Sequence, residues 1–409
     1  MTLRAYKYRI YPTQTQVNYL NQVIGSVRFV WNQLVANFNS WSHEGPNRIL
    51  NEKILKDIPE FSWLNESISY ALQQKRIDFD ETKKQFFNKC RKKKLGRMKF
   101  KSKGISRDSF RIPGQALNFN KCVDFEQSRI KLPKLTPIKI IIDRKFNGLL
   151  RSITVSKNSC NQYFVSVLIE EVIELKSNTG RSIGIDLGLI DLATLSNGMK
   201  IKNPKWFRES QTKLKKAQQH LSRKVKGSNR RTKARLKVTQ IHNKISQQRS
   251  FLHHNLSTWL VENHDHILLE NLNVAGMKKM FGKSISDAGF SSLVNMIKYK
   301  CLWYGKTFHQ VDRFFPSSKL CSICGHKMNK EDMTLDVRDW KCPSCHAHHD
   351  RDLNAATNIL HRGLKDLYNF SSDELADYRR GEAVRPEVSL PKASSVKRLV
   401  NFIDFDRLT

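Results

Sequence analysis

The sequence predicts a multidomain α+β protein, with a β-rich domain in its first half and a mixed α/β domain in its second. Its 409 residues exceed the ~100–200 residues of one typical domain, and 39% of them are hydrophobic, which suffices for several cores. Near residue 110 the periodicity changes from helical to strand-like. Beyond residue 181 strand and helix patterns alternate, as they do in a sheet covered by helices.

The first hundred residues are predicted to form one strand followed by helices. Residues 3–12 alternate basic with aromatic or aliphatic side chains and end at Pro12, a pattern typical of a short strand. A helix capped by Thr13 or Thr15 is expected next, because apolar residues recur at every third or fourth position. They are Leu20, Ile24, Val27, Trp31 and Leu34. Further helix is expected through residue 94, with breaks near residues 45–46 and at Pro59.

Short β-like runs dominate residues 110–176 and predict a small antiparallel barrel or sheet. The runs lie at 138–142, 152–155 and 163–170, with turn residues between them. The polar segment 177–181 is predicted to be a domain boundary.

The remainder of the chain is predicted to be a mixed sheet of ribonuclease H type. Two apolar runs joined at Asn197–Gly198 indicate a hairpin, and a long basic helical region follows over 204–264. A strand over 266–274, a helix over 289–305 and a strand over 306–312 come next. A cysteine-rich insertion then precedes a helix that opens at Asp352.

The charge distribution indicates a nucleic-acid partner. Lysine and arginine number 72 against 37 acidic residues, a net charge of +35. Two stretches, 83–107 and 202–249, carry +27 of this charge and together contain a single acid, Glu209. This composition favours contact with phosphates over an ordinary solvated surface. The last 47 residues balance eight bases with eight acids, and 365–409 is interpreted as a tail, with disorder as one interpretation.

No apolar run is long enough to cross a membrane and no export signal is visible, so we expect a cytoplasmic protein.

Four of the eight cysteines have the spacing of a zinc site. The spacing C-x2-C-x17-C-x2-C, formed by Cys321, Cys324, Cys342 and Cys345, predicts a structural zinc ion, because four thiolates leave no open position for water. One competing pattern is the C-x-x-C-H haem attachment motif that ends at His346, which the absence of an export signal disfavours. The other cysteines are scattered and are expected to be reduced.

Three acids are candidates for a catalytic metal site. Asp186 lies in a strand between Gly184 and Gly188, which predicts open space around it. Glu270 ends an apolar run, and Asp352 starts a helix. A ribonuclease H-like sheet brings such acids to one point, where they can hold two Mg²⁺ or Mn²⁺ ions for hydrolysis of a phosphodiester. Singly, Glu270 reads as a strand-end charge and Asp352 as a helix N-cap.

Two acids compete with these candidates. Asp191 competes for the position near the hairpin, and Asp350 competes for the third position.

Several motifs resemble those of the TnpB family of RNA-guided DNA endonucleases, which insertion sequences encode and from which type V CRISPR effectors derive. The motifs, in the order of the family, are AYKYRIYP, SVRFVWN, GIDLGL, LLENLNV, SISDAGF with YGK, FPSSKLCSICG and HHDRDLNAATNIL. The resemblance covers residues 5–362 and implies that Asp186, Glu270 and Asp352 are a RuvC-type triad with Mg²⁺ or Mn²⁺. It also implies a zinc ribbon, a guide RNA from the transposon end, and double-stranded target DNA recognised beside a short flanking motif. His346 departs from the family pattern, which often has glycine there.

The resemblance further implies a domain division. A wedge-like β-barrel is expected over 1–15 and 108–178, with a helical recognition segment, 16–107, inserted in it. A RuvC-like nuclease domain over 182–314 and 350–364 would contain a zinc ribbon, 315–349. Two other functions stay open. One is a nuclease-dead RNA-guided repressor, although such proteins lose triad acids that are all present here. The other is a guide-independent nucleic-acid-binding or transposition accessory protein, although transposase signatures are absent.

Overall fold

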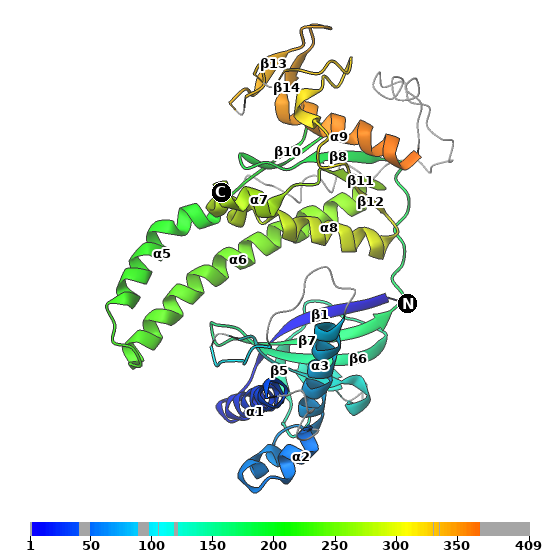
Figure 1. The fold of residues 1–409 in the computed structure, drawn as a ribbon. Helices are drawn as coiled ribbons and strands as arrows, with labels where there is room; N and C mark the ends of the chain where they lie inside the picture. Colours follow the sequence, from blue (N-terminus) through cyan, green and yellow to red (C-terminus); the bar gives the residue numbers. More distant parts are fainter. Residues whose placement is uncertain are drawn as a thin grey trace. The chain divides into compact units, whose positions relative to one another are not determined.

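The computed structural model describes residues 2–40, 50–88, 98–104, 106–117, 122–329, 331–334 and 336–368. The chain divides into two compact units, Met1–Ile173 and Glu174–Thr409 (Figure 1). The division falls a few residues before the expected boundary, because segment 177–181 is bonded to the second unit. No helix among the described residues is both long enough and apolar enough to span a membrane.

The first unit is a seven-stranded sheet with helices between its first two strands. The sheet order is β2-β6-β7-β1-β5-β4-β3, and the paired strands are antiparallel. The strands are β1 (Thr2–Tyr11), β2 (Asp108–Pro113), β3 (Val123–Asp124), β4 (Arg129–Ile130), β5 (Ile138–Ile141), β6 (Leu149–Lys157) and β7 (Tyr163–Glu171). The helices are α1 (Gln14–Asn39), α2 (Glu52–Asp57) and α3 (Ser69–Phe87), with 3-10 turns at Pro59–Glu66 and Gly114–Ala116.

Alternation along β1 and the stripe of α1 build the core of this unit, as the sequence predicts. The inward residues Tyr6, Tyr8 and Ile10 are buried, whereas the basic residues between them are not. All five predicted apolar residues of α1 are buried. Thr13 caps α1, because its hydroxyl accepts the Gln16 N–H while the Gln16 side chain accepts the Thr13 N–H.

The second unit is a five-stranded mixed sheet with helices on both faces. The order is β10-β9-β8-β11-β12, in which β8, β11 and β12 are parallel and the β8–β9–β10 pairs are antiparallel. The strands are β8 (Ser182–Asp186), β9 (Asp191–Leu195), β10 (Lys200–Lys202), β11 (His266–Leu269) and β12 (Thr307–Gln310). The helices are α5 (Trp206–Ser222), α6 (Asn229–Asn263), α7 (Val274–Ala288), α8 (Phe290–Tyr304) and α9 (Arg351–Tyr368). A 3-10 turn (Ser317–Lys319) and the hairpin β13 (Asp339–Lys341) and β14 (His348–Asp350) precede α9.

Helices cover both faces of this sheet (Figure 1), and each face has its own core. On one face, Ile183, Ile185 and Ile267 pack with α6, α7 and α8. On the other, Leu268 packs with Ile359 and Leu364 of α9. The second core puts α9 directly over the central strands, where it can present side chains to the ends of β8 and β11.

Three expectations differ from the structure in this unit. The helical region 204–264 is two helices, because the chain turns at Gly227 with φ +86° and α6 then starts under a Ser228 cap. The strand expected over 266–274 ends at Leu269. The helix α7 follows it, and its glycines and polar residues hid it from the sequence prediction. The predicted turn at Asn197–Gly198 is confirmed, with Gly198 at φ +89°.

Candidate functional site

Two of the three candidate acids end adjacent parallel strands. Asp186 is the last residue of β8, and Glu270 directly follows β11. Ile185 pairs with Leu269 across these strands, so the next residue along each strand lies at the same edge of the sheet. The Leu187 N–H donates to Glu270 Oε1 over 3.2 Å, which fixes the glutamate beside Asp186.

The third acid reaches this edge because α9 lies unusually close to β8. An ideal Cβ on Gly184 would lie 2.1 Å from the carbonyl oxygen of Ala356 and 2.7 Å from the nitrogen of Leu360. Asp352 is one helical turn before Ala356, and Asp186 is two residues after Gly184, so both acids lie on the same side of this contact. The expectation of open space beside Asp186 is therefore wrong, since the backbone of α9 fills the place of the missing side chain.

The charges of the three acids act on one another. Burial, followed by the charges of Glu270 and Asp352, raises the pKa of Asp186 well above its usual value. Burial raises the pKa of Glu270 to about 7, although hydrogen bonds from the Leu187 N–H and Asp186 lower it. Carboxyl groups that resist ionisation in this way form a site that a bound cation would stabilise.

The two competing acids have other partners. Asp350 Oδ1 accepts the Leu353 N–H over 2.9 Å and therefore caps α9, and its Oδ2 accepts from Lys200 Nζ over 2.6 Å. The N-cap role that the sequence offered to Asp352 thus belongs to Asp350. Asp352 instead lies 3.4 Å from an Arg338 guanidinium nitrogen. Asp191 opens β9, and its backbone oxygen faces Gly188.

The four cysteines come together as one cluster. Their sulfur atoms all lie within 4.8 Å of one another, with Cys321–Cys345 and Cys324–Cys342 both at 3.6 Å. Four thiolates at ~2.3 Å from a zinc ion would stand ~3.8 Å apart, so the geometry suits zinc. A haem attachment motif would use only the second cysteine pair and His346. In the fold the first cysteine pair lies beside the second, which favours a four-cysteine metal site over haem attachment.

The two cysteine turns have the same backbone pattern. The Cys321 carbonyl accepts the Gly325 N–H, and the Cys342 carbonyl accepts the His346 N–H, each over 2.9 Å. Gly325 and His346 therefore occupy equivalent positions, with φ +76° and +60°. His346 adopts a left-handed conformation that favours glycine, which gives a physical reason why the family often has glycine there.

Side chains of α9 hold the segment that contains the cysteines. Buried Asn354 donates to the Leu320 carbonyl over 2.7 Å and accepts the Ser322 N–H over 2.9 Å. Asn358 donates to the carbonyls of Ser317 and Leu320. His349, the second residue before Arg351, lies 3.1 Å from the sulfur of Cys321. The sequence shows both asparagines, but only the fold reveals what they bind.

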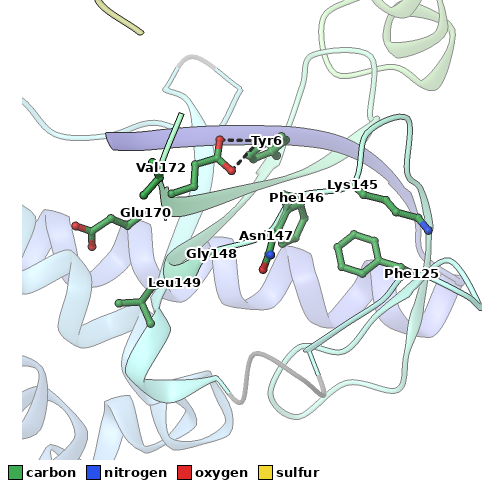
Figure 2. A pocket seen from close by; sticks show the side chains of 10 residues that line it. Tyr6, Phe125, Lys145, Phe146, Asn147, Gly148, Leu149, Glu170 and Val172 are labelled. Carbon is green, nitrogen blue, oxygen red and sulfur yellow. Dashed lines mark hydrogen bonds between the residues drawn. The ribbon is translucent and has the colours of Figure 1, made fainter. Parts of the chain in front are cut away.

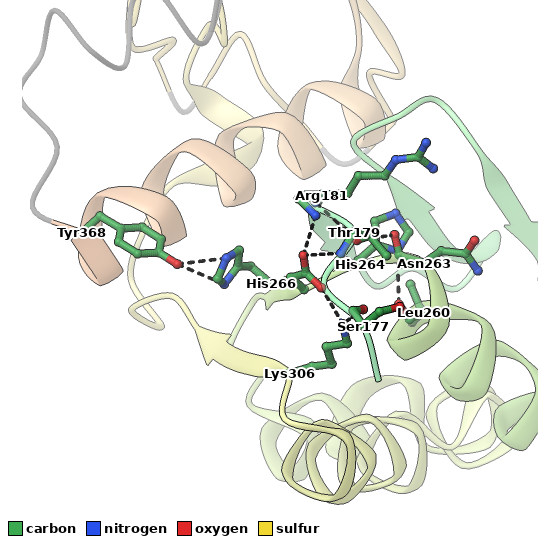
Figure 3. Close-up of polar contacts among 11 residues, drawn as sticks. Ser177, Thr179, Arg181, Leu260, Asn263, His264, His266, Lys306 and Tyr368 are labelled. Carbon is green, nitrogen blue, oxygen red and sulfur yellow. Dashed lines mark hydrogen bonds and ion pairs between the residues drawn. The ribbon is translucent and has the colours of Figure 1, made fainter. Parts of the chain in front are cut away.

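A buried ion pair anchors the start of the second unit (Figure 3). Lys306 Nζ donates to Asp265 Oδ1 over 2.5 Å and to the Ser177 carbonyl over 2.7 Å, and its side chain is fully buried. Asp265 Oδ2 accepts the N–H groups of Thr179 and Gly180. Asp265 directly precedes β11 and Lys306 directly precedes β12. The ion pair therefore joins the starts of these two strands, at the end of the sheet opposite the acidic edge.

The structure describes all of the second basic stretch but only part of the first. Stretch 202–249 lies on β10, α5 and α6, and its exposed cations include Lys213, Lys215 and Lys216. Positions 89–97 and 105 of stretch 83–107 lie outside the described residues. Of its phenylalanines, Phe86 packs against the core of the first unit, whereas Phe87 and Phe100 are exposed.

A hollow of about 790 Å³ lies in the first unit (Figure 2). The rings of Tyr6 and Phe125 lie 5.2 and 5.0 Å from that of Phe146, and the Tyr6 hydroxyl donates to Glu171. Two carboxylates and one lysine line the hollow, so its charge does not favour a phosphate.

Comparison with known proteins places the chain in a family. A relative from Streptomyces pristinaespiralis with the description "Putative RNA-guided DNA endonuclease" is 37% identical, over 97% of this chain and 96% of its own length. The chain belongs to the TnpB family. A relative from Escherichia coli K12 with the same description and the name InsQ is 31% identical, over 88% of this chain and 92% of its own length. A TnpB-like protein of Acanthamoeba polyphaga mimivirus is 27% identical over 34% of this chain and 28% of its own length.

Family models match three parts of the chain, and a solved structure has a similar fold. Models described as "Probable transposase", "Cas12f1-like, TNB domain" and "Helix-turn-helix domain" match residues 164–280, 290–359 and 1–45. The described part of 1–45 forms strand β1 and helix α1. A Cas12f1–sgRNA–target DNA complex contains a chain of similar fold, with a TM-score of 0.50 and 17% identity, over 85% of this chain and 83% of that one.

Proposed function

We propose that the protein is an RNA-guided DNA endonuclease of an insertion sequence, which binds a guide RNA from the transposon end and cuts matching double-stranded DNA beside a short flanking motif. The observation that carries the proposal is the meeting of Asp186, Glu270 and Asp352 at one edge of the sheet. Relatives with matching descriptions over most of their length support the substrate.

The acidic edge fits a pair of hard divalent cations. Its donors are carboxylate oxygens, which Mg²⁺ and Mn²⁺ prefer. The pKa values of Asp186 and Glu270 are raised first by burial and then by neighbouring negative charge, and a bound cation would offset both effects. Three carboxylates at one edge can hold two such ions ~3.5–4 Å apart. When bound, the ions would supply an activated water and neutralise charge on the phosphodiester.

The chain itself supplies position and charge. Asp186 and Glu270 are held rigidly by the strands, while Asp352 is held by α9, so the site depends on how these elements pack. Arg338 is the cation next to Asp352, at 3.4 Å. The basic helices α5 and α6 would bind nucleic-acid phosphates without reading sequence.

The domain roles follow from the family. We assign 1–15 and 108–178 to a wedge-like β-barrel, 16–107 to a recognition segment, 182–314 and 350–364 to a RuvC-like nuclease domain, and 315–349 to a zinc ribbon. In the ribbon, zinc would bind Cys321, Cys324, Cys342 and Cys345. Apart from 365–368, which continue α9, the tail lies outside the described residues.

Two measurements test the proposal. RNA that copurifies with the protein is sequenced, and a DNA duplex matching the most abundant species is incubated with the complex and Mg²⁺. Cleavage by the wild type, its loss in Asp186→Ala with guided binding retained, and activity of the matched control Asp191→Asn would support it. Cleavage by Asp186→Ala would refute the triad. Guided binding without any cleavage would indicate a repressor, and a mixture of cellular RNA a guide-independent protein.

A further inference from the structure

A small cavity adjoins the turn that follows Asp186. Its volume is about 230 Å³, and its wall includes Leu189 and Ile190 of that turn. Leu189 is three residues beyond Asp186, so their Cα atoms are at most ~10 Å apart. Asn203 donates to the Leu189 carbonyl over 3.0 Å and fixes the wall.

Two cations line this cavity and form no ion pair within the described part of the chain. They are Lys205 and Arg208, at the start of α5. Among the described residues, the hydrogen-bond partner of Arg208 is the neutral Ser284 hydroxyl, over 3.2 Å. Lys205 has a left-handed backbone, φ +52°, a strained conformation of the kind often kept at functional positions.

The one acid in the wall is already neutralised. Both carboxylate oxygens of Asp287 accept the Phe207 N–H at 3.1 Å, and Arg249 lies 3.4 Å from one of them. Its side chain is 5% exposed. The charges of Lys205 and Arg208 therefore remain available to an anion from outside.

Two of the lining side chains are apolar and exposed. Ile190 is 55% and Phe281 45% exposed, although both could pack inward on hydrophobic grounds alone. The backbone of α7 leaves helical geometry at Phe281, with φ −119° and ψ 36°. An aromatic ring beside cations is the combination with which proteins bind single-stranded nucleotides.

We propose that this cavity is a nucleotide subsite for the DNA strand being cut, in which Lys205 and Arg208 bind one phosphate and Phe281 contacts the adjoining base or sugar. Successive phosphates of a strand are ~3.4 Å apart along a duplex axis, so a strand whose scissile phosphate lies at Asp186 reaches the cavity within a few nucleotides. The subsite would hold the strand in register for cutting. This inference rests on the proposed function.

The test combines a charge-removing variant with neutral phosphates. Arg208→Gln keeps a donor for Ser284 but loses the charge, and Lys205→Asn keeps a residue that tolerates the left-handed backbone. Lys298→Gln, on the exposed face of α8 and outside both basic stretches, is the matched control. Single-turnover cleavage by the guided complex is measured on target strands that carry one methylphosphonate at successive positions.

We expect Arg208→Gln and Lys205→Asn to cut about tenfold to a hundredfold more slowly, with unchanged guided binding and with wild-type rates for Lys298→Gln. One methylphosphonate near the cut should slow the wild type by a similar factor and slow Arg208→Gln no further, because both changes remove the same contact. As a readout independent of activity, Phe281→Ala should abolish photocrosslinking to 5-iodouracil at the adjoining nucleotide.

Two outcomes would overturn the subsite. One is that Arg208→Gln cuts like the wild type. The other is that its defect multiplies with that of the methylphosphonate at every position. Both require a wild type that cuts, so absence of cleavage by the wild type and failure of the subsite are distinguishable.

Discussion

The close contact between β8 and α9 predicts that Gly184→Ala impairs cleavage. The added Cβ would lie 2.1 Å from the Ala356 carbonyl oxygen, and folded proteins rarely bring such atoms closer than 3.0 Å. The strand and the helix must therefore separate by about 0.9 Å, because a backbone oxygen cannot rotate away as a side chain can. Asp352, one turn away on α9, would move with the helix.

The magnitude follows from this displacement. Overpacking of this kind costs about 1–3 kcal/mol of folding free energy. For a unit of this size each kcal/mol lowers the melting temperature by about 2–4 °C. A misplacement near 1 Å at a catalytic group lowers the rate about a hundredfold. Loss of rate should thus exceed what partial unfolding explains.

The assay is single-turnover cleavage by the guided complex at saturating Mg²⁺, at a temperature where melting curves show the variant folded. Gly25→Ala in α1 is the control, because its Cβ would meet nothing within 4 Å and should stabilise the helix slightly. A Gly184→Ala variant that is less stable yet cuts at the wild-type rate would show that the contact does not position Asp352.

Three further outcomes are expected. Asp265→Asn should lower the free energy of unfolding of the second unit by about 3–5 kcal/mol at neutral pH, because it leaves Lys306 buried without a counter-charge. Although burial raises the pKa of Asp265, hydrogen bonds from Lys306 and Gly180 hold it below its ordinary value. The contribution of Asp265 to the free energy of unfolding is therefore present above pH ~4 and is lost as the pH falls through the folded pKa. In denaturant titrations, the free energies of unfolding of variant and wild type should converge in acid. A difference that stays constant with pH would contradict the ion pair. His346→Gly should stabilise the zinc-bound protein by about 1 kcal/mol in melting experiments, since it removes left-handed strain, whereas a lower melting temperature would show that the imidazole has a role of its own. Removal of zinc by a chelator should speed amide hydrogen exchange over 351–358 but not in the middle of α6, and equal protection with and without metal would argue against the link between the cysteine cluster and α9.

Local patterns predicted the elements whose signals lie within a few residues. The apolar stripe of α1, the Asn197–Gly198 turn and the strand at 163–170 needed no distant partner to be recognised. The spacing of the cysteines identified their cluster in the same way. The prediction failed where the cause is tertiary. Gly184 reads as a gap in a strand until a helix more than 160 residues later is known to fill it.

Roles that depend on a partner were equally hidden. Residue type and spacing alone do not separate Asp350 from Asp352, which the family motif favours. Their contacts show that Asp350 caps α9 and binds Lys200, whereas Asp352 lies at the acidic edge. Lys205 and Arg208 are two cations among many until the fold places them beside Phe281. Chain periodicity carries no information on such encounters.

Asn354 and Asn358 donate hydrogen bonds to the backbone around Leu320, so the cysteine segment and α9 form one structural unit that should be inherited together. A chimera that joins the cysteine segment of one relative to the final helix of another would leave buried amides and carbonyls without partners, at about 1–3 kcal/mol each. Recombination points inside residues 317–358 should therefore be selected against, whereas exchange of the whole block should be tolerated. In shuffled libraries of related sequences, functional clones should inherit both asparagines and the Leu320 segment from the same parent.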